Sequence, residues 1–161
     1  MSSILKVDTI QTTAGAAPTT KDLGFAAGSI LQVANGLLAT GVNNTTASYV
    51  DTGLTATITP KFASSKILVL VNIMAVENGT ATEGTSVKLV RGSTDLSEWG
   101  RYMGYTRTYM NAHPSLNYLD SPATTSATVY KVQFKRSQGS GRTDINANNC
   151  TSSITLMEIA Q

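Results

Sequence analysis

The sequence contains one cysteine, one histidine and few charged side chains, and each scarcity excludes a kind of site. Because Cys150 stands alone, the chain can form neither an internal disulfide nor a cysteine-rich zinc site. His113 has no partner at the spacing that metal ligands need. We therefore expect structural roles for both residues, and neither a metal nor a cofactor.

Catalytic motifs are also missing. The sequence has no glycine-rich segment ending in Gly-Lys-Ser or Gly-Lys-Thr and no dinucleotide-binding fingerprint after a predicted strand. A nucleophilic serine or cysteine would need a base, and the only histidine precedes Pro114 in a predicted loop. Asp95 and Glu98 are the one close acidic pair in the aromatic part of the chain, and a helix cap or surface pair explains them better than glycoside hydrolysis. We predict no catalytic residues and no enzymatic activity.

Charge and hydropathy exclude two further partners. The formal net charge is +2, and the Lys and Arg residues are too dispersed to form the basic stripe that nucleic acid binding needs. The longest apolar run, Lys66 to Val76, is too short for a membrane span, which takes about 20 residues. We expect no nucleic acid partner and no membrane insertion.

This apolar run is the predicted centre of the fold. It is rich in β-branched residues and reads as a strand with Ile67, Val69, Val71 and Ile73 on one side and Leu68, Leu70 and Met74 on the other. Both faces must then be covered by protein, and one of them needs a second sheet or a neighbouring subunit.

The rest of the chain predicts short antiparallel strands separated by turn signals. Leu54, Ala56 and Ile58 alternate with threonines that should face solvent, and Thr128 to Lys135 is the cleanest period-two stretch. The fold class is therefore all-β, an antiparallel β-sandwich of jelly-roll type. The other expected elements are strands at Ser29–Val33, Leu37–Val42, Ser48–Asp51, Thr85–Arg91 (paired with the central strand) and Ser153–Ala160, a turn at Asn35-Gly36 and a hairpin loop at Ser137–Arg142.

The N-terminal region differs in composition from the rest. Residues 1–24 contain a short alternating piece with Ile4, Leu5, Val7 and Ile10, followed by a Thr, Ala, Gly and Pro run. We predict an extended arm over residues 1–24 and one β-sandwich domain over residues 25–161. The arm carries too little apolar surface to fold alone, so it either holds on to another protein or is a frayed terminus.

The segment from Asp95 to Asp120 holds half of the aromatic residues of the chain. Helical spacing of Leu96, Trp99 and Met103 allows one helical turn, but Gly100 and Gly104 weaken it, and we expect a long loop with a short strand. Aromatic rings and arginines suit binding to sugars or to a protein surface, and packing over the sandwich or between subunits is the alternative. The predicted target-binding residues are Trp99, Arg101, Tyr102, Tyr105, Arg107 and Tyr109.

Four blocks, in order, carry a family resemblance. Residues 3–11, 58–69, 121–133 and 153–159 together resemble small tail-fibre-like virion proteins of tailed phages, cyanophages among them. The resemblance implies a homotrimer on the tail or capsid exterior whose N-terminal segment anchors it to other virion proteins. In this chain, the expected anchor residues are the apolar ones of the arm, Ile4, Leu5, Val7 and Ile10. The β domain would then face a host-surface glycan or protein.

Two classes of function follow, and a third is weaker. The first is a tail fibre or fibre-tip protein that attaches to the host surface. The alternative is a decoration protein that cements the capsid or tail. A depolymerase is third, because the chain lacks the paired acids that polysaccharide cleavage needs.

Overall fold

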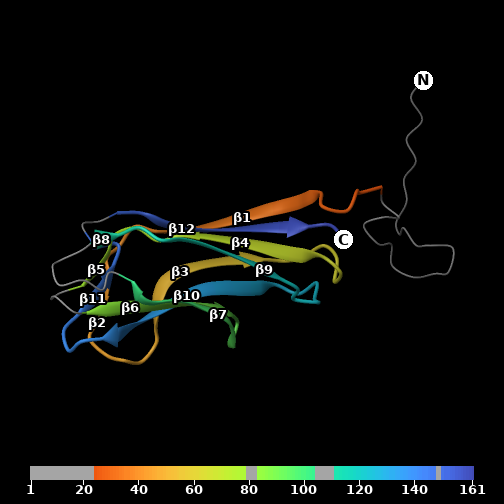
Figure 1. Cartoon of the computed structure of the whole chain (residues 1–161). Helices are drawn as coiled ribbons and strands as arrows, with labels where there is room; N and C mark the ends of the chain where they lie inside the picture. Colours follow the sequence, from red (N-terminus) through yellow and green to blue (C-terminus); the bar gives the residue numbers. More distant parts are fainter. Residues whose placement is uncertain (1–23, 79–82, 104–110, 148–149) are drawn as a thin grey trace, which may run out of the picture.

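The computed structural model describes residues 24–78, 83–103, 111–147 and 150–161, and within them it contains β-strands and no α-helix (Figure 1). Eight of the strands have six residues or more and four are shorter. The strands are β1 (Ile30–Leu38), β2 (Val42–Asn44), β3 (Val50–Ile58), β4 (Lys66–Asn72), β5 (Val76–Asn78), β6 (Gly84–Arg91), β7 (Thr94–Met103), β8 (Asn111–Ala112), β9 (Ser115–Asp120), β10 (Thr128–Gln138), β11 (Thr143–Ile145) and β12 (Ser152–Ile159).

The long strands form two antiparallel sheets that pack face to face. Sheet I has the order β1-β12-β4-β9 and sheet II the order β3-β10-β6-β7. Numbered along the chain, the first long strand pairs with the eighth, the second with the seventh, the third with the sixth and the fourth with the fifth. This is one long hairpin rolled into two layers, so the predicted antiparallel sandwich of jelly-roll type is confirmed.

The short strands form a third sheet, which we call the end sheet, in the order β2-β11-β5-β8. Each of its strands lies in a connection that crosses between sheets I and II. The end sheet therefore closes one end of the sandwich. The first described residues and the C-terminus lie at the opposite end (Figure 1), where Gly28 N donates to the carbonyl of Ala160 at 2.9 Å.

The core lies between sheets I and II and follows the alternation in the sequence. Leu54, Ala56 and Ile58 of β3 are buried and the intervening threonines are exposed, as predicted. Tyr130, Val132 and Phe134 of β10 and the predicted inner face of the central strand are buried too. Burial of each large apolar side chain contributes about 1.5–3 kcal/mol, which explains why the alternating stretches fix the register.

Several predicted boundaries were wrong. The turn at Asn35-Gly36 does not exist, because β1 continues through it. The reason is Gly36, which lies so close to β3 that a Cβ there would overlap the carbonyl oxygen of Thr55. Glycine here permits a close backbone approach and not a turn.

The central strand and its partners also differ from the prediction. The apolar run divides into β4 and β5, and β4 lies in sheet I whereas β6 lies in sheet II, so the predicted pair does not form. The loop after β10 likewise leads into the end sheet and not back along β10. Alternation specifies which face of a strand is buried, but it does not specify which sheet the strand joins.

The segment from Asp95 to Asp120, expected as a long loop with a short strand, is strand over most of its described residues. Trp99 pairs with Val87 and Met103 with Thr85, and the register of β7 shifts at three places along β6. Each bulge adds a residue to one strand and breaks the period of two. The apolar spacing that resembled a helix therefore comes from a bulged strand.

Candidate interaction surfaces

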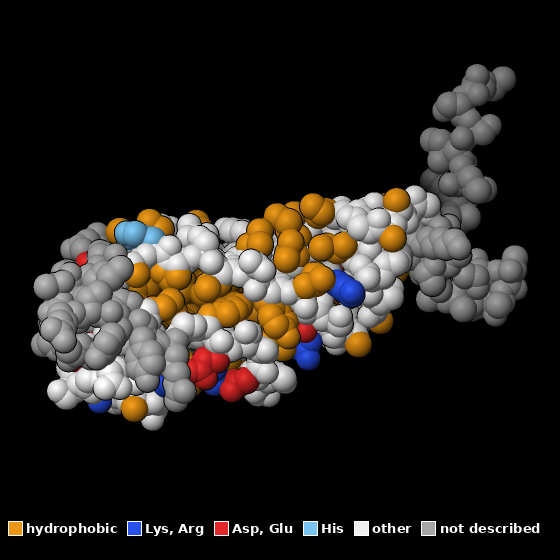
Figure 2. Space-filling model, viewed as in Figure 1, with side chains coloured by type: hydrophobic (Ala, Val, Ile, Leu, Met, Phe, Trp, Pro, Cys, Tyr) orange, Lys and Arg blue, Asp and Glu red, His pale blue; other side chains and the backbone are white. Residues whose placement is uncertain are grey.

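The outer face of sheet I is apolar and exposed. Hydrophobic side chains gather over the strands of this sheet in Figure 2. The exposed large side chains on it are Ile30 (58%), Val33 (57%), Leu37 (66%), Leu70 (38%) and Leu119 (51%). Leu68 and Leu70 belong to the outer side of the predicted central strand, and the described residues leave Leu70 exposed and Leu68 half-buried.

These residues form ordered rows across the sheet. Val33 pairs with Met157, Met157 with Leu68 and Leu68 with Leu119, which makes one continuous apolar row across the four strands. The neighbouring row contains Asn35, Thr155, Leu70 and Asn117. The sequence predicted the outward side chains of β4. It did not predict that β1, β9 and β12 extend the same apolar face, because the order of strands in a sheet is not visible in the sequence.

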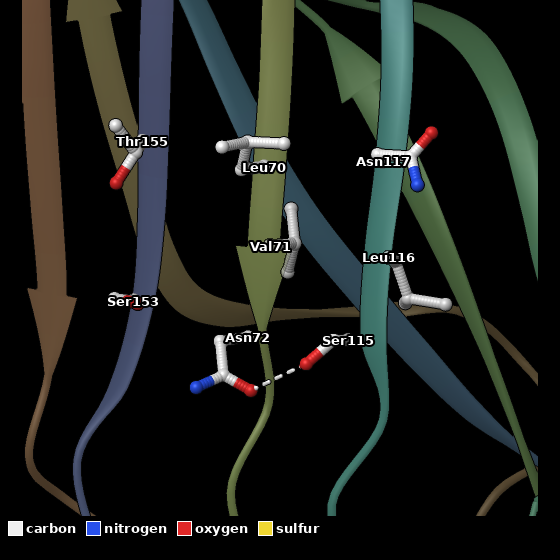
Figure 3. A pocket seen from close by; sticks show the side chains of 8 residues that line it. All are labelled: Leu70, Val71, Asn72, Ser115, Leu116, Asn117, Ser153 and Thr155. Atoms are coloured by element: carbon white, nitrogen blue, oxygen red, sulfur yellow. Dashed lines mark hydrogen bonds between the residues drawn. The ribbon is translucent and has the colours of Figure 1, made fainter.

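A shallow pocket of about 340 Å³ lies on the same face, toward the end sheet (Figure 3). Ser115 Oγ donates to Asn72 Oδ1 at 3.0 Å on its floor. The lining carries no titratable side chain, so the pocket can offer hydrogen bonds and apolar contact but no charge. Its residues are Leu70, Val71, Asn72, Ser115, Leu116, Asn117, Ser153 and Thr155.

The outer face of sheet II has the opposite character. Lys131 Nζ lies 3.0 Å from Asp51 Oδ2, and Lys88 Nζ lies 2.8 Å from Asp95 Oδ1. Partial burial would raise the pKa of Asp51, but hydrogen bonds from Gln133 and Lys131 outweigh it and lower that pKa. Such exposed ion pairs are typical of a solvated surface.

Two lysines of sheet II also face an aromatic ring. The ammonium groups of Lys88 and Lys135 lie 4.4 and 4.3 Å from the centre of the Tyr49 ring. Burial, and then the hydrogen bond to the Glu98 carboxylate, raise the pKa of Tyr49 above its ordinary value of 10.0. These contacts hold Tyr49 within the charged face.

The end sheet rests on buried polar side chains. Thr85 Oγ1 donates to Asn78 Oδ1 at 3.0 Å, and the hydroxyls of Thr85 and Thr143 share a hydrogen bond. Arg136 Nη1 donates to the carbonyls of Thr45 at 2.6 Å and Gly141 at 2.8 Å. The buried threonine and asparagine contacts tie β6 to β5 and β11 of the end sheet.

His113 has the structural role that we expected. Its Nδ1 accepts a hydrogen bond of 3.0 Å from the main-chain N–H of Ala75. Ala75 has a φ of 50°, in the left-handed region that side chains other than glycine rarely adopt. The imidazole therefore helps to hold the backbone between β4 and β5.

The predicted target-binding residues are only partly described. Trp99 in β7 is half-buried and packs against the core, and Arg101 and Tyr102 belong to the same strand. Tyr105, Arg107 and Tyr109 lie outside the described residues, as do the predicted anchor residues Ile4, Leu5, Val7 and Ile10. β8, which begins at Asn111, belongs to the end sheet, and Met103 at the end of β7 pairs with Thr85 near the start of β6.

Among the described residues, no group of three or more His, Cys, Asp or Glu side chains could hold a metal ion. Over the same part of the chain, no helix has the length and hydropathy to span a membrane.

Neither a protein-family model nor a curated protein sequence matches the chain. The fold is similar to a region of VP2 in the subviral particle of infectious bursal disease virus, with a TM-score of 0.53 and 9% identity. That match covers 80% of this chain and 33% of VP2, so the chain spans about one third of its length. A match to dimeric latent PorU from Porphyromonas gingivalis has a TM-score of 0.37, 10% identity, and covers 85% of this chain and 14% of that one.

Proposed function

We propose that this chain is a virion structural protein, a tail fibre or fibre-tip protein that attaches to the host surface. The observation that carries the proposal is the division of the sandwich into two ends. The first described residues and the C-terminus lie at one end, and the end sheet lies at the other (Figure 1). One end can then hold the particle while the other faces outward. The resemblance of four sequence blocks to tail-fibre-like proteins and the likeness of the fold to VP2 support the same class.

The arm and the end sheet have separate roles in this proposal. Ile4, Leu5, Val7 and Ile10 would add to the sheet edge of another virion protein, which satisfies backbone groups that a lone arm leaves to water. Tyr105, Arg107 and Tyr109 would contact a host glycan or protein, together with Arg101 and Tyr102. Trp99 would support them from its place against the core.

The decisive experiment is to locate the chain in a density map of the assembled particle. A sandwich at the distal end of a tail appendage, with the end sheet outward, is the expected result. A particle without the chain, or a chain with its end sheet against another virion protein, would overturn the proposal.

A decoration protein is the second candidate, and the exposed apolar face of sheet I favours it, because such a face suits close packing among neighbours. Location on the capsid, with no binding of purified protein to host cells, would support this role. We expect no enzymatic activity in either case, and reducing ends released from host capsule would indicate a depolymerase instead.

A further inference from the structure

The two outer faces of the sandwich differ in charge. Ion pairs between lysines and carboxylates cover sheet II. In the described strands of sheet I, Lys66 is the only charged residue at an outward position. The outer face of sheet II is therefore suited to contact with water, whereas the outer face of sheet I exposes leucine, isoleucine, valine and methionine side chains.

The size of the apolar face suits association between proteins. Four strands spaced about 4.8 Å apart and about eight residues long give the whole outer face of sheet I, polar positions included, a footprint of about 500 Å². Two such faces in contact cover about 1,000 Å², which is where specific protein interfaces begin. Every protein surface carries single, scattered hydrophobic residues, but the apolar side chains of this face lie next to one another and form one continuous surface.

The pattern of side chains on this face is complementary to itself. Two copies can approach without repulsion, since no carboxylate and a single lysine project from the face. The row with Asn35, Thr155, Leu70 and Asn117 contains three side chains that can both donate and accept hydrogen bonds, and Asn35 Nδ2 already donates to Thr155 Oγ1 within the chain. The remaining donors and acceptors of this row can pair with the same row of another copy.

The position of the first described residues also favours association between copies of this chain through sheet I. Gly28 N donates to Ala160 O at 2.9 Å, and Ala160 N donates to Ser29 O at 2.9 Å, so the arm leaves the domain from sheet I. Copies joined through sheet I would therefore bring their arms together at one end, as a shared anchor requires.

We propose that the outer face of sheet I is the surface through which copies of this chain associate, with three sheets I around the axis of a homotrimer. The number of copies rests on the proposed fibre function, whereas the location of the interface does not. The apolar row from Val33 to Leu119 and the shallow pocket beside it are then buried between copies.

The test is a charge placed at both ends of the apolar row. Val33→Glu with Leu119→Glu changes two exposed side chains, so the fold should survive, but the carboxylates would face each other in the assembly. Val129→Glu is the matched control, because Val129 is 40% exposed on the outer face of sheet II. Native mass spectrometry and sedimentation at micromolar concentration measure the assembly, and thermal melting measures the fold.

We expect a trimer for the unchanged chain and for Val129→Glu, and a folded monomer for the double variant. An unchanged chain that is monomeric, or a double variant as trimeric as the control, would overturn the interface. If the double variant fails to fold, Val33→Ser with Leu119→Ser replaces it, and at least a tenfold weaker association is expected. Location on the particle is measured separately, so a monomer found at a tail tip would refute the interface and leave the fibre function intact.

Discussion

The hydroxyl of Tyr130 in sheet II donates a hydrogen bond of 2.6 Å to the carboxylate of Asp120 in sheet I. Arg91 Nη1, also from sheet II, donates to the same carboxylate at 2.7 and 2.9 Å. Asp120 is only 6% exposed, so this carboxylate joins the two sheets from within the sandwich. Its removal would leave a phenol and a guanidinium without their acceptor.

Asp120→Asn should therefore lower the free energy of unfolding by about 2 kcal/mol, because one partner of a largely buried charge pair is lost. Urea unfolding at pH 7 measures the change. Asp51→Asn is the control, since Asp51 also accepts from a lysine and an uncharged donor but on the exposed face. It should cost less than about 1 kcal/mol. Equal losses in the two variants would contradict the importance of this bridge.

Tyr130 should make the protein sensitive to alkaline pH. Burial, and then the hydrogen bond to Asp120, raise the pKa of Tyr130 above its ordinary value of 10.0, although Arg91 opposes this. The unfolded chain loses the phenolic proton near pH 10 while the folded chain keeps it. Stability is thus complete below that pH and falls above it, by about 1.4 kcal/mol per pH unit from this group. Unfolding of the unchanged chain and of Tyr130→Phe between pH 9 and 11 measures the difference, and parallel curves would refute it.

The sequence predicted the fold well where side chains alternate without interruption. β3 and β10 bury the predicted residues because one inward face decides the burial of the whole strand. It failed at β7, where bulges produce helix-like spacing, and at Gly36, where glycine serves a contact with Thr55 that is distant in sequence. The apolar face of sheet I was predicted only in part, through Leu68 and Leu70. The alternation of side chains within one strand does not show which other strands pair with it.

Gly36→Ala tests the close approach of β1 and β3. A methyl group at this position would overlap the Thr55 carbonyl, so the strands must separate or the backbone must shift. We expect a loss of about 3 kcal/mol in the free energy of unfolding, as for an overpacked core. Thr57→Ala, on the exposed side of β3, is the control and should cost less than about 1 kcal/mol. A variant as stable as the unchanged chain would show that β1 tolerates a wider spacing.

The arm should be dispensable for folding. A shortened chain that begins at Phe25 keeps every described strand, so its melting temperature should stay within a few degrees of that of the full chain. It should retain target binding and fail to enter particles assembled with it in place of the full chain. Particle incorporation is scored by mass spectrometry of purified virions, and normal incorporation would refute the anchor role of Ile4, Leu5, Val7 and Ile10.

The tyrosines between β7 and β8 should contribute to target binding. Tyr105→Ala with Tyr109→Ala should weaken binding to host cells at least tenfold, because such rings supply much of the contact energy in recognition surfaces. The control is Tyr49→Ala, which removes a ring from the charged face of sheet II. Cell binding per folded molecule is the measurement. Equal binding by the first variant and the unchanged chain would remove these tyrosines from the site.

The central place of β12 in sheet I also determines when that sheet can form. β12 lies between β1 and β4, yet it is the last of the described strands to be synthesised. On the ribosome, β1 and β4 have no strand between them until β12 has emerged, and pairing between strands so distant in sequence is slow to form. The apolar face of sheet I therefore cannot be completed before β12 has been synthesised, although β1, β4 and β9 leave the ribosome earlier.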